Sequence, residues 1–148
     1  MKNNKYSPYT KILANFSRIL KDNHIKWCVG STTSLFFQGV KVFPKDIDIV
    51  INKKQMKMFI NELEKDGFIL LIDTDLFNGK RFVKASINQF SMPIEFVGFD
   101  ITKDKLLQIS INNIDIYVHS LEDELKFYKS RVGKEQIVNL IIQKLKSK

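Results

Sequence analysis

Residues that could cross-link the chain or bind zinc are scarce in these 148 residues. The sequence holds one cysteine, Cys28, and two histidines, His24 and His119. A single cysteine cannot form an internal disulfide, and these ligands are too few for a structural zinc site. Disulfide-stabilised and zinc-finger classes are therefore excluded.

Long apolar runs are missing too. No run approaches the roughly 20 residues that cross a bilayer, so no membrane association is expected. The polar, charged N-terminal part has no apolar block typical of a signal peptide, which predicts an intracellular, cytoplasmic protein. Hydrophobic residues make up 44% of the chain, enough for a continuous core, and we expect a single domain over residues 1–148.

Several nucleotide-binding and nucleic-acid-binding motifs are absent. The chain has no Walker-type phosphate loop or dinucleotide fingerprint, which argues against an ATPase or a dehydrogenase. It has no helix-turn-helix, zinc-finger or RNA-recognition motif, so nucleic-acid binding rests on charge alone. The formal net charge is +8, which would attract a nucleoside triphosphate or a nucleic acid. An AT-rich genome or a hot habitat explains the same lysine excess equally well.

Apolar residues recur at helical spacing in some segments and at strand spacing in others. The predicted helices cover residues 10–22, 32–38, 54–65, 121–130 and 134–145. The predicted strands cover residues 25–29, 46–51, 68–72, 81–87, 93–99 and 114–118. Asn78–Gly79 is a turn signal, and Asn52 is expected to cap the helix that follows it. The pattern predicts an α/β (α+β) fold with a core at about 25–118 and C-terminal helices at about 121–147.

The segment from Val29 to Ile51 is the most informative part of the sequence. A short strand ends at Gly30–Ser31, a short helix and a loop follow, and a second strand opens with Asp46 and Asp48. Backbone N–H groups exposed at a Gly-Ser turn before a helix can approach a phosphate. Strand alternation places the two aspartates on one face, where their carboxylates can hold one or two Mg²⁺ ions. Together these features would bind a metal-nucleotide.

This segment resembles the signature of the nucleotidyltransferase fold superfamily, which includes DNA polymerase beta-like and minimal nucleotidyltransferases. The signature is an apolar residue, Gly, then Gly or Ser, a spacer, and Asp-apolar-Asp or Glu. The matching residues here are Val29, Gly30, Ser31, Asp46, Ile47 and Asp48. The resemblance implies a mixed β-sheet flanked by helices, with C-terminal helices after it.

The resemblance also implies a third carboxylate on a neighbouring strand, as a metal ligand or as a base toward the acceptor. Glu95 is the candidate, because it stands between two strand-forming apolar residues. Asp100, just beyond it, is the reserve candidate. At this point the choice between them stays open.

The activity implied by the resemblance is metal-dependent nucleotidyl transfer. A nucleoside monophosphate would pass from a Mg²⁺-bound nucleoside triphosphate to a hydroxyl acceptor, with release of pyrophosphate. Ser31 and the N–H groups after it would hold the β- and γ-phosphates. Lys126, Arg131 and Lys134 are further candidates for phosphate contacts, although a solvated helix face is the simpler interpretation of these three residues.

The acceptor and the nucleotide base cannot be inferred from the sequence. So short a chain leaves little room for a separate acceptor-binding domain, so a homodimer partner or a second protein would complete that site. The alternative hypothesis is an interaction module, non-catalytic or protein-modifying, such as the antitoxin of a toxin–antitoxin pair. Other small members of this fold perform that role.

Overall fold

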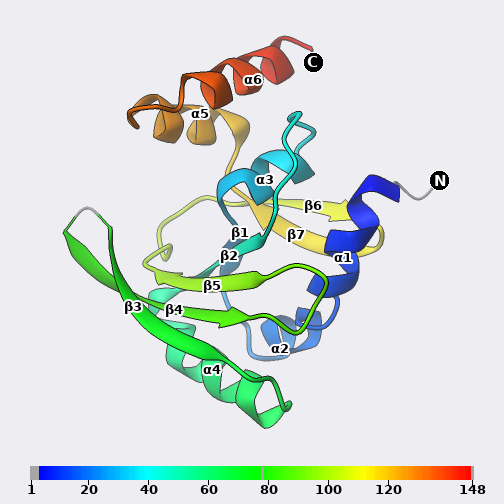
Figure 1. Cartoon of the computed structure of the whole chain (residues 1–148), viewed down its shortest axis with the longest axis vertical. Coiled ribbons are helices and arrows are strands. Elements are labelled where there is room, and N and C mark those ends of the chain that lie inside the picture. Colours follow the sequence, from blue (N-terminus) through cyan, green and yellow to red (C-terminus); the bar gives the residue numbers. More distant parts are fainter. Residues whose placement is uncertain (1–3, 78, 148) are drawn as a thin grey trace.

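The computed structural model describes residues 4–77 and 79–147 and is built around a five-stranded sheet (Figure 1). The order across the sheet is β1-β2-β5-β4-β3, with β2 parallel to β5 and the other pairs antiparallel. These strands are β1 (Trp27–Val29), β2 (Ile47–Asn52), β3 (Leu71–Phe77), β4 (Lys80–Ile87) and β5 (Ile94–Phe99). The predicted mixed sheet is thereby confirmed.

The remaining elements surround this sheet. A separate antiparallel hairpin consists of β6 (Leu107–Ile111) and β7 (Ile114–Val118). The helices are α1 (Ser7–Leu13), α2 (Ser17–Asp22), α3 (Ser31–Phe37), α4 (Met56–Lys65), α5 (Leu121–Lys129) and α6 (Glu135–Lys146). Short 3-10 turns, η1 (Asn4–Tyr6) and η2 (Lys53–Gln55), precede α1 and α4. No helix in the described part of the chain is long and apolar enough to span a membrane.

The two faces of the sheet differ in what covers them. Ile47, Ile49 and Ile51 alternate along β2 and are fully buried in a core with residues of α1, α2 and α4. Because side chains alternate along a strand, Asp48 faces the other side. There α3 packs with α5 and α6 through a second apolar cluster that includes Leu35. Figure 1 shows these last helices together at one end of the molecule.

One helix expected at residues 10–22 is in fact two helices. α1 ends at Leu13 and α2 begins at Ser17. The Asn15 side-chain amide donates to the carbonyls of Lys11 and Ile12, at 3.1 Å each, and such bonds compete with the helical ladder. The break allows Phe16, which is fully buried, to enter the core. The prediction of a single helix was therefore wrong.

Three further expectations differ from the structure. The strand expected at 68–72 begins only at Leu71, because the Phe68 ring packs against Phe16 at 5.1 Å. The strand β6 was not predicted at all. Asn52 caps no helix, since its Oδ1 instead accepts the N–H of Ile101 at 3.1 Å. Of the predicted Asn78–Gly79 turn, Asn78 lies outside the described residues, and Gly79 has a φ of +76°.

Candidate active site

Three carboxylates meet at the start of β2. Asp46 lies just before this strand, Asp48 lies within it, and Glu95 lies opposite Asp48 on the parallel strand β5. One carboxylate oxygen from each residue lies within 4.8 Å of the others, and all three residues are partly exposed. An all-oxygen set of ligands suits Mg²⁺. Asp100 is not part of this group; its side chain is exposed and accepts the N–H of Thr102 at 3.1 Å.

The crowding of these acids changes the chemistry of Asp48. Burial, together with the negative charges of Asp46 and Glu95, raises the pKa of Asp48 to about 7. A hydrogen bond from the Ser31 hydroxyl and the positive charge of Lys84 act in the opposite direction. A divalent cation would relieve the repulsion among the three carboxylates, so these residues fit the ion that the fold implies.

Lys84 contributes a positive charge to the site from the neighbouring strand β4. Its Nζ lies 3.8 Å from Oε1 of Glu95, and both side chains are partly exposed. The sequence could not reveal this contact, because it depends on the β4–β5 register, which pairs Ser86 with Glu95. In the sequence alone, a lysine on a strand of alternating polar and apolar residues indicates a solvent-exposed side chain.

Thr33 holds the backbone on both sides of Ile47. Its buried hydroxyl donates to the carbonyl of Asp46 at 3.3 Å and accepts the N–H of Asp48 at 3.1 Å. The first turn of α3 thereby fixes the spacing of two of the acids. Sequence analysis missed this role, because a hydroxyl residue near a helix start usually indicates a cap.

Within the Gly30–Ser31 turn, the residue with the positive φ is Ser31 and not Gly30. Gly30 is extended, with φ −124°, whereas Ser31 adopts the left-handed conformation at φ +51°. Gly30 donates its N–H to the carbonyl of Asp48 at 2.9 Å, and a Cβ there would lie 3.2 Å from a methyl of Val50. Close packing, rather than a positive φ, therefore requires glycine. The strained residue is Ser31, whose hydroxyl bonds the Asp48 carboxylate.

Solved structures of other proteins share the fold of this chain. No protein-family model matches the chain, and no characterised protein matches it in sequence. A solved structure from Thermotoga maritima, TM1012, inferred to be a nucleotidyltransferase, matches with a TM-score of 0.68. That match covers 100% of this chain and 97% of the other, at 18% identity. This chain has the nucleotidyltransferase fold.

Two other solved structures share this nucleotidyltransferase fold. The lincosamide antibiotic adenylyltransferase LnuA, bound to lincomycin, matches with a TM-score of 0.59 at 13% identity, over 91% of this chain and 94% of LnuA. The antibiotic-resistance factor ANT(2'')-Ia matches with a TM-score of 0.53 at 12% identity, over 98% of this chain and 86% of that protein. At such identities the likeness concerns the fold.

On this nucleotidyltransferase fold, the three predicted C-terminal cations lie in different surroundings. The Arg131 guanidinium lies over the rings of Phe77 and Phe127, at 5.1 and 5.4 Å from their centres. In the described residues, neither Lys126 nor Lys134 forms an ion pair with the three carboxylates. Lys126 is exposed on α5 and Lys134 is half-buried before α6.

Tyr128 lies within electrostatic range of Arg131 and of Asp48 and was not predicted as a site residue. Its pKa is raised to about 12, first by burial and then by the charges of Glu124 and Asp48, while Arg131 lowers it. Tyr128 is therefore within electrostatic reach of both Asp48 and Arg131.

Proposed function

We propose that this protein is a Mg²⁺-dependent nucleotidyltransferase that moves a nucleoside monophosphate from a triphosphate to a hydroxyl acceptor. The observation that carries the proposal is the meeting of Asp46, Asp48 and Glu95 directly beside the Ser31 turn. The shared fold of the three solved structures supports it. These comparisons give no support to a toxin-like partner or a homodimer.

Asp46, Asp48 and Glu95 would hold the metal through carboxylate oxygens. Bound Mg²⁺ would neutralise phosphate charge and align the triphosphate for in-line displacement. Ser31 and the N–H groups after it would contact the β- and γ-phosphates. Lys84 would orient Glu95, because its ammonium lies 3.8 Å from that carboxylate.

The transfer step exchanges one bond to the α-phosphorus for another. The acceptor oxygen forms a bond to the α-phosphorus while the bond from that atom to the bridging oxygen of pyrophosphate breaks. Glu95 takes the acceptor's hydroxyl proton as general base, or acts as the third metal ligand. The electron pair of the broken bond leaves with pyrophosphate.

Calorimetric binding of ATP, GTP, CTP and UTP in the presence of Mg²⁺ tests this proposal. LnuA is named as an adenylyltransferase, so ATP is the first donor to test. We expect one triphosphate to bind wild type in a metal-dependent manner and to lose binding in Asp46→Asn/Asp48→Asn. The matched control is Asp73→Asn/Asp75→Asn, which changes the charge equally at two exposed residues outside the carboxylate group.

Two outcomes would count against the transferase proposal. One is that no triphosphate binds the wild-type protein with Mg²⁺. The other is that the control variant loses binding as strongly as the site variant, since the effect would then come from net charge and not from metal ligation.

A further inference from the structure

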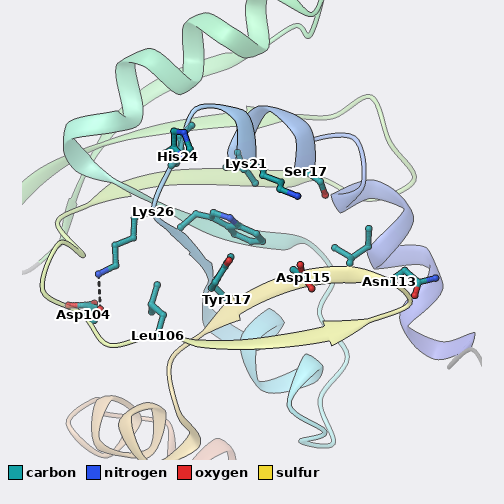
Figure 2. A pocket seen from close by; sticks show the side chains of 13 residues that line it. Ser17, Lys21, His24, Lys26, Asp104, Leu106, Asn113, Asp115 and Tyr117 are labelled. Carbon is teal, nitrogen blue, oxygen red and sulfur yellow. Dashed lines mark hydrogen bonds between the residues drawn. The ribbon is translucent and has the colours of Figure 1, made fainter.

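A cavity lies away from the three carboxylates, between α2 and the β6–β7 hairpin (Figure 2). Its volume is about 730 Å³, which is within the range of small-molecule sites. The rings of Trp27 and Tyr117 line it, with their centroids 5.5 Å apart and their planes at 82°. Leu20 of α2, Ile25 before β1 and Ile114 of β7 add aliphatic side chains to the lining.

This cavity lies on the opposite face of the sheet from the proposed transfer site. Trp27 pairs with Ile51 and belongs to the core face, whereas Asp48 is on the other face of β2. A ligand in the cavity is separated from the carboxylates by the sheet. It cannot be the acceptor that attacks a triphosphate held at Ser31, so the cavity needs its own explanation.

The charges around the cavity are of two kinds. Lys26 and Asp104 already have partners within the protein. The Lys26 ammonium donates to the carbonyls of Thr102 and Asp104, at 2.9 and 2.7 Å. The Asp104 carboxylate bonds His119 at 2.9 Å. These contacts fix the loop that forms one end of the cavity. They leave Lys26 and Asp104 less available to a ligand.

Lys21 and Asp115 are the other two charged residues that line the cavity. Lys21 projects from α2 on one wall and Asp115 from β7 on the facing wall (Figure 2). Both are exposed, and neither takes part in an ion pair within the residues that the structure describes. The cavity therefore offers one positive and one negative group on facing walls, beside its aromatic side chains.

We propose that this cavity binds a small zwitterion with an apolar body, namely an amino acid with a large apolar side chain. Its carboxylate pairs with Lys21, its ammonium pairs with Asp115, and its side chain packs against Trp27 and Tyr117. A ligand with a single charge leaves one of the two walls without a partner. The proposal does not depend on the transferase activity.

Fluorescence of Trp27 tests the proposal directly, because it is the single tryptophan of the chain. The probes are L-phenylalanine, phenethylamine, which lacks the carboxylate, and 3-phenylpropionate, which lacks the ammonium. We expect a saturable change with L-phenylalanine and roughly tenfold weaker binding of each analogue, as for the loss of one charge-assisted hydrogen bond.

Two variants test which charged group of the ligand pairs with Lys21 and which pairs with Asp115. In Lys21→Gln, L-phenylalanine should bind no better than phenethylamine, and in Asp115→Asn no better than 3-phenylpropionate. Lys57→Gln, at an exposed position of α4 outside the cavity, should leave all three affinities unchanged. The proposal is overturned if L-phenylalanine gives no saturable change. It is equally overturned if both analogues bind wild type as tightly as the zwitterion.

Discussion

Asp48 is surrounded by groups that oppose its ionisation. Burial and two neighbouring acids raise its pKa from 3.8 to about 7, so near neutral pH a proton competes with the metal. We predict that Mg²⁺ affinity rises with pH up to about 7 and then levels off, falling by up to roughly tenfold per pH unit below that point. Calorimetric Mg²⁺ titrations across this range measure it. An affinity independent of pH would contradict the assignment.

The same pKa has a consequence for the metal-free protein. A carboxyl whose folded-state pKa is raised favours folding in its protonated form, so its contribution is lost as the pH rises from about 4 to about 7. Asp48→Asn should therefore stabilise the metal-free protein at alkaline pH, by on the order of 1–2 kcal/mol after allowance for solvent screening. Asp100→Asn, at an exposed acid outside the group, serves as the control for both measurements.

Thr33 provides a second test at the residue scale. Thr33→Val keeps the shape of the side chain but leaves the Asp48 N–H without its hydroxyl partner. We expect a loss of about 1–3 kcal/mol in the free energy of unfolding, together with weaker Mg²⁺ binding because the acids lose their spacing. Thr10→Val removes another buried hydroxyl, which donates to the Tyr6 carbonyl at 3.2 Å. It should lower stability and leave Mg²⁺ affinity unchanged.

The junction between β1 and α3 depends on close packing against β2. Gly30→Ala is compatible with the backbone at φ −124°, but the new Cβ would lie 3.2 Å from a methyl of Val50. We predict a cost of about 1–2 kcal/mol from overpacking, measured by denaturant unfolding. The double variant Gly30→Ala/Val50→Ala should recover part of that cost relative to Val50→Ala alone. Strictly additive losses would show that the methyl contact is not the cause.

Helix α5 and the residues after it carry the cations of the C-terminal region. Arg131 lies close enough to Tyr128 to act on its charge, and Tyr128 in turn lies near Asp48, so Arg131→Gln should weaken triphosphate binding by about five- to tenfold, as for the loss of one charged phosphate contact. Lys126→Gln removes the same charge from an exposed position of α5 and should have a smaller effect. Equal effects of the two variants in calorimetry would mean that only net charge matters.

At the scale of elements, local patterns predicted most helices and strands. α4 lies close to its expected position and ends before Gly67, whose φ of +88° suits glycine after a helix. The break at Asn15 depends on side-chain bonds to the helix backbone, which apolar periodicity does not report. β6 was missed because the Asn112–Asn113 turn, in which both residues have a positive φ, was not used as a hairpin signal.

At the scale of the whole molecule, two apolar clusters meet. One lies between the sheet and α1, α2 and α4, and the other joins α3 to α5 and α6. Val42 packs against both clusters, in the loop between α3 and β2. The carboxylates therefore lie where the sheet meets the C-terminal helices, and Tyr128 from those helices comes near Asp48.

The sequence predicted the three acids of the site but not the residues that hold them in place. Asp46 and Asp48 follow the Gly-Ser turn in the order that the resemblance requires, and the resemblance also led to Glu95. Lys84 and Thr33 could not be predicted, because their roles depend on strand register and on the packing of α3 against β2.

Anomalous diffraction from crystals grown with Mn²⁺ and a non-hydrolysable ATP analogue shows where the metal and the phosphates bind. We predict an anomalous peak within coordination distance of Asp46, Asp48 and Glu95, with the triphosphate reaching toward Ser31. A metal peak elsewhere, or a fully bound analogue whose phosphates do not approach these carboxylates, would contradict it.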